Sequence, residues 1–170
     1  MISIFETERL ILRPTDQQDA SFIYALVNTP KWLKNIGDRN VHSENDAAIY
    51  IQQKMTLQYE KLGFGNFTVI RKKDNVKLGT CGLYDRQGID GVDIGFAFLP
   101  EFENQGYGFE SASEVMFRAK NDFGLNCLYA ITLEENISSQ KLIEKLGFYR
   151  EGLITLPPSE EKLMLYKKVL

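Results

Sequence analysis

A strand, a helix and a second strand follow one another in the second half of the chain, and this order limits the possible folds. Residues 91–99 and 127–133 alternate like strands, and residues 106–123 between them carry apolar side chains at helical spacing. Two strands joined by a long helix pair in parallel, because a tight hairpin turn cannot connect them. We therefore expect at least one parallel strand pair.

The other strands indicate antiparallel pairing. Residues 64–71 and 77–84 flank a polar turn, and residues 148–156 and 161–168 flank two prolines, so each pair is predicted to form a hairpin. Residues 8–14 add a first strand. Together these patterns predict an α/β (α+β) fold with a mixed, mostly antiparallel central sheet of about seven strands.

About four helices are expected to flank this sheet. Thr15 or Asp16 is a candidate N-cap for the first helix, and Ser43 for the second, which Gly63 ends. The other two helices cover residues 106–123 and 137–146, whereas residues 28–42 look irregular. Because no repeat or linker interrupts the pattern, residues 1–170 are predicted to form a single domain.

Composition excludes several classes of protein. The net charge is −3 and the sequence pI about 5.3, so no general basic field is present to hold nucleic acid. No apolar run approaches the roughly 18 residues of a membrane span, and the first residues lack the apolar core of a signal peptide. We therefore expect a cytoplasmic protein that binds neither nucleic acid nor membranes. Cys81 and Cys127 lie in apolar runs and are interpreted as structural thiols rather than nucleophiles.

Residues 94–110 are the segment most informative about function. They are predicted to form a strand, a loop with two glycines, and the start of a helix. Glycines let the backbone approach a ligand, and a helix amino terminus presents unpaired N–H groups, so the segment suits a phosphate or pyrophosphate. The glycines alone would equally serve packing or a turn. The lysine of a P-loop and the Gly-x-Gly-x-x-Gly pattern of dinucleotide-binding proteins are both absent, which disfavours an ATP-binding protein.

The strand before this loop has one face with small residues at its middle. Asp93, Gly95 and Ala97 share that face by the alternation of a strand. A face of this kind lets a ligand lie close against the strand, or it admits a packed helix; spacing alone does not decide between them.

Two motifs resemble those of the GNAT acetyltransferases. Glu103-Asn104-Gln105-Gly106-Tyr107-Gly108 is similar to that family's acetyl-CoA loop, usually Arg/Gln-x-x-Gly-x-Gly/Ala. About thirty residues on, residues 136–148 resemble the second motif, which runs from an asparagine to a Gly-Phe pair. Residues 7–13 and 32–39 resemble the RimJ/RimL-like branch, which acetylates ribosomal-protein amino termini and some small amines. The resemblance spans nearly the whole chain.

The resemblance implies the GNAT fold and acetyl-CoA as co-substrate, without a metal. Main-chain N–H groups of the loop would hold the pyrophosphate, the backbone of Phe96 and Phe98 would pair with the pantetheine amides, and an N–H near Phe98 or Leu99 would polarise the acetyl carbonyl. Asn136 would bond the pantetheine arm and Lys145 would lie near the phosphates. The implied cofactor-binding residues are Phe96, Phe98, Leu99, Asn104, Gly106, Tyr107, Gly108, Phe109, Asn136 and Lys145.

This sequence also departs from the family pattern. Glu103 places a negative charge where arginine or glutamine is usual, and Ile143 replaces the tyrosine that serves many relatives as general acid. Two functions therefore stay open. One is an N-acetyltransferase in which an amine attacks the thioester directly, and the other is a catalytically weak or inactive acyl-CoA-binding module. Homodimers are common in this family.

Several residues are candidates for the general base. Asp93 is the first candidate, because it lies on the small face where relatives often carry glutamate, although it could be a surface residue at a sheet edge. Glu134, with Glu135 beside it, is the second, and it could also attract a cationic acceptor. His42 is a further candidate or a solvated loop residue. The aromatic residues Trp32, Tyr84 and Phe67 are candidate walls of an acceptor pocket or simply core. The acceptor itself is a protein amino terminus or a small cationic amine.

Overall fold

A computed structural model describes residues 2–170. Within them, eight strands form one sheet in the order β1-β2-β3-β4-β5-β6-β8-β7, and every neighbouring pair is antiparallel except β5 and β6, which are parallel. The strands are β1 (Phe5–Glu6), β2 (Leu10–Pro14), β3 (Asn66–Arg71), β4 (Val76–Asp85), β5 (Val92–Phe98), β6 (Cys127–Thr132), β7 (Tyr149–Thr155) and β8 (Lys162–Val169). The mixed, mostly antiparallel sheet is thus confirmed, with one strand more than expected.

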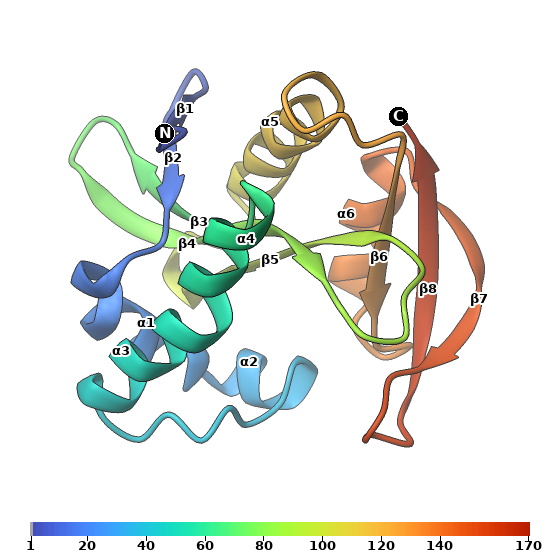
Figure 1. The fold of residues 1–170 in the computed structure, drawn as a ribbon, viewed down its shortest axis with the longest axis horizontal. Helices are drawn as coiled ribbons and strands as arrows, with labels where there is room; N and C mark the ends of the chain where they lie inside the picture. The colour runs from blue at the N-terminus through green and yellow to red at the C-terminus, as the bar shows by residue number, and fades with distance from the viewer. Residues whose placement is uncertain (1) are drawn as a thin grey trace.

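Five helical segments accompany this sheet in the described part of the chain. The first is α1 (Ala20–Val27), which follows a short 3-10 turn, and the last two are α5 (Tyr107–Asn121) and α6 (Ile137–Lys145). Between them lie α2 (Pro30–Asn35) and a long helix made of α3 (Glu44–Ile51), a π-helical turn (Gln52–Thr56) and α4 (Leu57–Leu62). Figure 1 shows α1 to α4 on one side of the molecule and β6, β7 and β8 on the other.

Local signals in the sequence account for most helix boundaries. The Ser43 hydroxyl accepts a hydrogen bond from the Asp46 N–H and so caps α3. Gly63 ends α4 in the left-handed conformation with φ 78°. Asp16, rather than Thr15, caps the 3-10 turn before α1, where Asp16 and Asp19 form a capping box.

Two elements differ from the sequence-based expectation. Residues 28–42 are not irregular throughout, because Thr29 caps α2 and Pro30 occupies its first turn. Strand β1 consists of Phe5 and Glu6 only, and it pairs with β2 at two positions. Both elements are too short to give a periodic pattern, so alternation and helical spacing could not identify them.

The sheet separates two hydrophobic clusters, and β5 contributes to both. Ile94, Phe96 and Phe98 belong to the cluster that contains the inward residues of α5 and α6. Ala97 and Leu99 pack instead with the cluster of α1 and α3. Since successive side chains of a strand point to opposite faces, α5 and α6 cover one face at β5, and α1 to α3 cover the other.

Candidate functional site

The site is built around one edge of β5 that its neighbour leaves open. All seven residues of β5, Val92 to Phe98, pair with β4. On the other edge β5 pairs with β6 at a single position, where Asp93 lies opposite Tyr129. Beyond Asp93 the two parallel strands therefore diverge, and a stretch of β5 main chain faces the gap between them.

The hydrogen-bond alternation decides which main-chain groups face this gap. The Leu99 N–H donates to the Leu78 carbonyl of β4 at 2.9 Å. In an antiparallel ladder the residues of one strand bond alternately to one side and to the other. Phe96 and Phe98 therefore direct their N–H and C=O groups toward β6. Of the two N–H groups expected to polarise a carbonyl, that of Leu99 is already bonded within the sheet and is not available for this role.

The loop after β5 leads to a helix amino terminus without a side-chain cap. Asn104 and Gly106 both take the left-handed conformation, with φ 58° and 84°. Gly106 is the N-cap of α5, and no side chain accepts a hydrogen bond there. The N–H groups of Tyr107, Gly108 and Phe109 have no partner within the helix, because the first turn of a helix lacks preceding carbonyls. These N–H groups and the helix dipole form an anion-binding surface.

Asp93 is deeply buried at the start of the open edge, with 1% of its surface exposed. Its Oδ1 accepts a hydrogen bond from Arg86 Nε at 2.8 Å, whereas its Oδ2 has no partner among residues 2–170. Burial raises the pKa of Asp93 to about 6, although the charge and hydrogen bond of Arg86 lower it. A carboxyl with this pKa changes its protonation state near neutral pH. The interpretation of Asp93 as a surface residue is therefore wrong.

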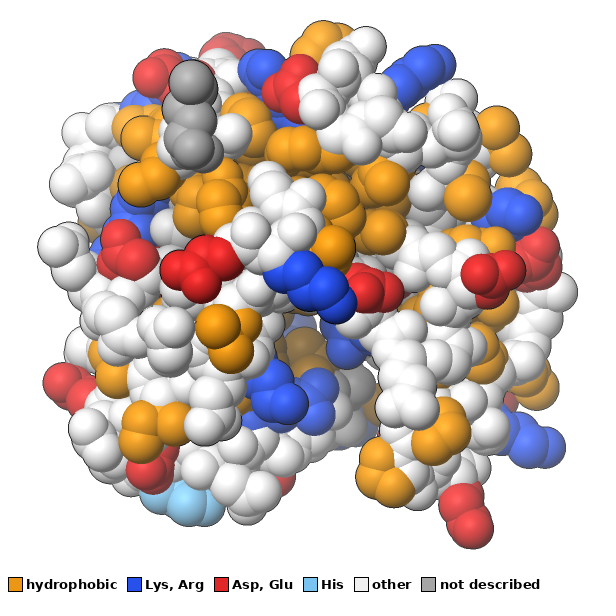
Figure 2. All heavy atoms as spheres, in the orientation of Figure 1, with side chains coloured by type: hydrophobic (Ala, Val, Ile, Leu, Met, Phe, Trp, Pro, Cys, Tyr) orange, Lys and Arg blue, Asp and Glu red, His pale blue; other side chains and the backbone are white. Residues whose placement is uncertain are grey.

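On the small face of β5 the Tyr84 side chain covers Gly95, while Ala97 packs with the cluster of α1 and α3. A Cβ on Gly95 would lie 2.9 Å from Cε2 of Tyr84, so the tyrosine ring occupies the space beside the glycine. The Tyr84 hydroxyl donates to Asn66 Oδ1, and the Arg86 guanidinium lies 4.9 Å from the ring centroid. Figure 2 shows a hollow in the surface between the part made by α1 to α3 and the part made by β6 to β8.

A comparison with known proteins identifies the family. The Acetyltransferase (GNAT) domain matches residues 9–149. The uncharacterized N-acetyltransferase YoaA of Bacillus subtilis is 31% identical over 155 residues, which cover 91% of this chain and 87% of that protein. The chain belongs to the GNAT acetyltransferase family. The predicted class of enzyme, an acetyl-CoA-dependent acetyltransferase, is thereby confirmed.

Solved structures of GNAT proteins share the fold. A GNAT-family acetyltransferase from Bacillus anthracis superposes with a TM-score of 0.80 at 25% identity, covering 98% of both chains. RimL, a ribosomal alpha-N-protein acetyltransferase in complex with coenzyme A, gives a TM-score of 0.84 at 18% identity and covers 99% of this chain and 98% of its own. At that identity the likeness concerns the fold alone. Within residues 2–170 no helix combines the length and apolar character that a membrane crossing needs.

Arg9 supports the GNAT loop, a role that the resemblance over residues 7–13 did not assign to it. Its Nε donates to Glu110 Oε2 at 2.7 Å, its Nη1 donates to the Gln105 carbonyl at 3.0 Å, and its guanidinium lies 4.4 Å from the centroid of the Tyr107 ring. Although burial raises the pKa of Glu110, the hydrogen bonds from Thr7 and Arg9 lower it overall, so the carboxylate stays charged and paired. The Tyr107 side chain is buried, while its main-chain N–H belongs to the first turn of α5 and has no partner within the helix.

Glu103 is neutralised by an ion pair that crosses from the loop to another helix. Its Oε2 lies in direct contact with Lys31 Nζ from α2. The negative charge that replaces the usual arginine or glutamine is therefore compensated. The pair also fastens α2 beside the loop. Only the folded chain brings these two residues together, since 72 positions separate them.

The second GNAT motif forms α6, which contacts the loop helix α5. Asn136 caps α6: its side-chain oxygen accepts from the Ser139 N–H, which leaves its NH₂ group to donate elsewhere. Lys145 Nζ lies 4.5 Å from the centroid of the Phe109 ring, at the first turn of α5. A positive charge thus stands near the free N–H groups.

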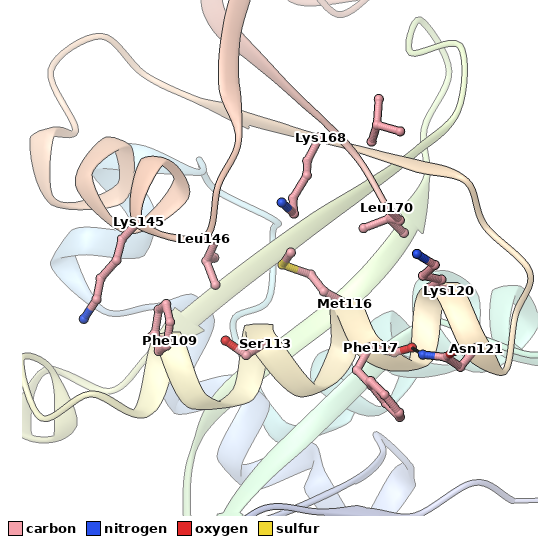
Figure 3. Close-up of a pocket in the computed structure, with 11 residues that line it drawn as sticks. Phe109, Ser113, Met116, Phe117, Lys120, Asn121, Lys145, Leu146, Lys168 and Leu170 are labelled. Atoms are coloured by element: carbon pink, nitrogen blue, oxygen red, sulfur yellow. Dashed lines mark hydrogen bonds between the residues drawn. The ribbon is translucent and has the colours of Figure 1, made fainter.

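A groove continues from Phe109 and Lys145 along the flank of α5. Figure 3 shows Lys168 reaching from β8 toward Met116 of α5, and Lys120 farther along the helix. The cavity measures about 360 Å³, and no carboxylate pairs with Lys120, Lys145 or Lys168 among residues 2–170. The wall is otherwise mainly apolar. The residues that line it are Phe109, Ser113, Met116, Phe117, Lys120, Asn121, Lys145, Leu146, Lys168, Val169 and Leu170.

Several candidate residues lie away from this arrangement. Glu134 and Glu135 are exposed in the turn before α6, and His42 is exposed before α3. Phe67 is fully buried and packs against Phe5 and Tyr59, so its interpretation as a pocket wall is wrong. The other structural side chains agree with expectation. Ile143 lies in the core, and burial raises the pKa of the Cys81 thiol to about 12.

Proposed function

We propose that this protein transfers the acetyl group of acetyl-CoA to a primary amine, on a protein amino terminus or a small cationic molecule, by direct attack of the amine on the thioester. One observation carries the proposal. The open edge of β5 leads from a buried carboxyl at one end to an uncapped helix amino terminus at the other. Such an edge pairs with an extended amide-containing arm, and such a helix end binds its pyrophosphate.

The residues along this edge fit acetyl-CoA. The Phe96 and Phe98 main-chain groups are free to pair with the pantetheine amides, and the Asn136 NH₂ group adds a donor across the gap. The N–H groups of Gly108 and Phe109 suit the pyrophosphate. The left-handed conformations of Asn104 and Gly106 set the course of the main chain between β5 and the amino terminus of α5. The groove beyond Lys145 offers apolar surface and three ammonium groups for the phosphorylated nucleotide.

Asp93 is the general base in this proposal. When bound, acetyl-CoA supplies an electrophilic thioester carbonyl, and the attacking amine must lose a proton. The orphaned Oδ2 of Asp93 accepts that proton directly or through one water, while Arg86 fixes the carboxylate through Oδ1. A main-chain N–H that β5 directs into the gap near Asp93 polarises the carbonyl. Glu134 is exposed near the end of β6 and attracts a cationic acceptor. It is neither buried nor paired as Asp93 is, so it does not replace Asp93 as the base.

A catalytically weak acyl-CoA-binding module is the second candidate. Ile143 favours it, because this buried isoleucine cannot protonate a leaving thiolate. In the enzymatic proposal, water takes that role. The two candidates share the acetyl-CoA site and differ only in whether an acetylated amine accumulates.

The first experiment measures thermal unfolding with acetyl-CoA, with ATP as the control. A ligand at about 100 times its Kd stabilises a protein by about 2.7 kcal/mol, which raises the Tm by roughly 5–10 °C at this size. A rise with acetyl-CoA alone supports the site, and a screen of peptide and small amines then separates enzyme from binding module. The absence of any rise with acetyl-CoA would refute both candidates.

A further inference from the structure

The Arg86 guanidinium has donors that its pair with Asp93 does not use. Its Nε donates to Asp93 Oδ1 at 2.8 Å, whereas its two Nη groups form no hydrogen bond within residues 2–170. The Arg86 side chain is 35% exposed, although its partner Asp93 is buried. A guanidinium presents its N–H groups in a planar fork that matches the two oxygens of a carboxylate. Arg86 can therefore hold Asp93 and a carboxylate of a ligand at the same time.

An aromatic ring fixes this guanidinium in place. Arg86 lies over the Tyr84 ring, 4.9 Å from its centroid. The Tyr84 hydroxyl donates to the buried side chain of Asn66, and the ring occupies the space beside Gly95. Because the ring is held in this way, the Nη groups of Arg86 have a defined position close to Asp93, whose Oδ2 has no partner within residues 2–170.

A second positive charge lies on the same face of the sheet as Asp93. Tyr129 of β6 is opposite Asp93, and Lys167 of β8 is opposite Tyr129. Residues that pair across strands point to the same face, so the three side chains form a row. The Lys167 ammonium lies 5.5 Å from the centroid of the Tyr129 ring and forms no ion pair within residues 2–170. The contact with Tyr129 and the charge of Glu151 raise the pKa of Lys167, so the ammonium stays charged at neutral pH.

The charges around Asp93 disfavour an acceptor that is purely cationic. Arg86 compensates the negative charge of Asp93, and Lys167 adds a further positive charge on the same face. A molecule with several ammonium groups is repelled by these cations. An amine that also carries a negative group can instead place its ammonium at Asp93 and its negative group at Arg86.

We infer that Arg86 is a specificity-determining residue whose Nη groups bind a carboxylate of the acceptor, so that the preferred acceptor is a primary amine with a carboxylate close to it. This inference rests on the proposed acetyl transfer with Asp93 as the base. An α-amino acid holds its amine nitrogen about 2.5 Å from its carboxylate carbon. One such molecule can bridge Asp93 and Arg86, because these two side chains are themselves in contact. An aspartate at the first position of a peptide offers a carboxylate that is only one bond farther from the amine.

Acetylation of two matched pairs of acceptors tests this inference on the wild-type protein. One pair is leucine and leucinamide. The other is two hexapeptides with amidated carboxyl termini, one beginning with aspartate and one with asparagine, so each pair differs only in one carboxylate. We expect kcat/KM to be roughly 10–100-fold higher for the carboxylate than for the amide in at least one pair, the effect of a charge-assisted hydrogen bond. The pair that shows the preference identifies the source of the carboxylate.

The basicity of the amine does not explain such a preference. A neighbouring carboxylate stabilises the ammonium form, so the amine of leucine is neutral less often than the amine of leucinamide. Because only the neutral amine attacks the thioester, this difference opposes the expected result. A diamine without a carboxylate completes the set of acceptors, and it should be a poorer acceptor than the preferred carboxylate.

Variants of Arg86 separate carboxylate binding from the effect of Arg86 on Asp93. Arg86→Gln is expected to lower activity with every acceptor, since it also removes the partner of the base. The ratio of kcat/KM within a pair reports the carboxylate contact alone, and it should fall to near 1. Arg86→Lys keeps the charge and should keep part of the preference. Arg150→Gln is the matched control, because Arg150 is exposed on β7 and lies opposite Tyr166, which belongs to the cluster of α5 and α6 on the other face. Its ratio should equal that of wild type.

Different results overturn this inference and the proposed function. If the wild-type protein acetylates both amides, or the diamine, as fast as the carboxylates, the role of Arg86 is overturned and acetyl transfer stands. A preference that persists in Arg86→Gln, or that Arg150→Gln abolishes equally, has the same meaning. A wild-type protein that acetylates none of the five acceptors would overturn both proposals.

Discussion

Replacement of Asp93 by asparagine is expected to stabilise the protein at neutral pH while it removes the general base. The ordinary pKa of an aspartate is 3.8, and burial raises that of Asp93 to about 6 despite the opposing effect of Arg86. The folded protein therefore binds this proton more tightly than the unfolded chain does. The free energy of unfolding therefore has its full value at low pH, falls as the pH rises from about 4 to about 6, and stays reduced above that range.

The size of the effect follows from the shift. A rise from 3.8 to about 6 corresponds to about 3 kcal/mol of stability lost at pH 7.5. Asparagine keeps an oxygen for Arg86 and carries no charge, but its NH₂ group replaces the orphaned Oδ2 and costs about 1 kcal/mol as an unsatisfied donor. A net gain of about 2 kcal/mol should raise the Tm by roughly 4–8 °C at this chain length.

Thermal unfolding at pH 7.5 and pH 4.5 checks this prediction. The Asp93→Asn variant should be more stable than wild type at pH 7.5, and the difference should shrink to near zero at pH 4.5. Glu134→Gln is the matched control: it removes an exposed carboxylate, and its Tm should follow wild type at both pH values. The reasoning is refuted if Asp93→Asn is less stable than wild type at pH 7.5, or if its advantage does not change with pH.

The remaining predictions concern rate and cofactor affinity. Asp93→Asn should lower kcat/KM by roughly 10²–10⁴-fold and remove the rise in activity through about pH 6; an unchanged pH–rate profile would exclude Asp93 as the base. Lys31→Ala leaves Glu103 unpaired beside the loop, so calorimetry should show weaker acetyl-CoA binding that an added Glu103→Gln restores. Gly106→Ala forces alanine into φ 84° at the loop, and Gly124→Ala does so at φ 66° with nothing within 4 Å. Both should lower the Tm by a few degrees, but only Gly106→Ala should weaken acetyl-CoA binding.

The fold was predictable from the sequence where the residues of one helix or strand identify that element by themselves. Ser43 and Gly63 bound the long helix as expected, and the strand–helix–strand order required the parallel pair of β5 and β6. The backbone conformation of the loop was also predictable, because Asn104 and Gly106 take the left-handed conformations that their residue types favour.

The side-chain part of the site depends on contacts between distant segments, which spacing along the chain does not reveal. Arg9 reaches Glu110 across 101 positions, and Lys31 reaches Glu103 across 72. The burial of Asp93 likewise results from the sheet around it. A local pattern describes one element at a time, so it could suggest these residue types but not their pairing.

Acetyl transfer itself is the most direct test of the proposed function. The protein is incubated with acetyl-CoA and a hexapeptide with a free amino terminus, and the peptide mass and the released CoA thiol are measured together. We expect the peptide to gain one acetyl group on its amino terminus for each CoA released, and the Asp93→Asn variant to lose most of this activity. Binding of acetyl-CoA without an acetylated product from any amine would contradict the proposed function and identify the protein as a binding module.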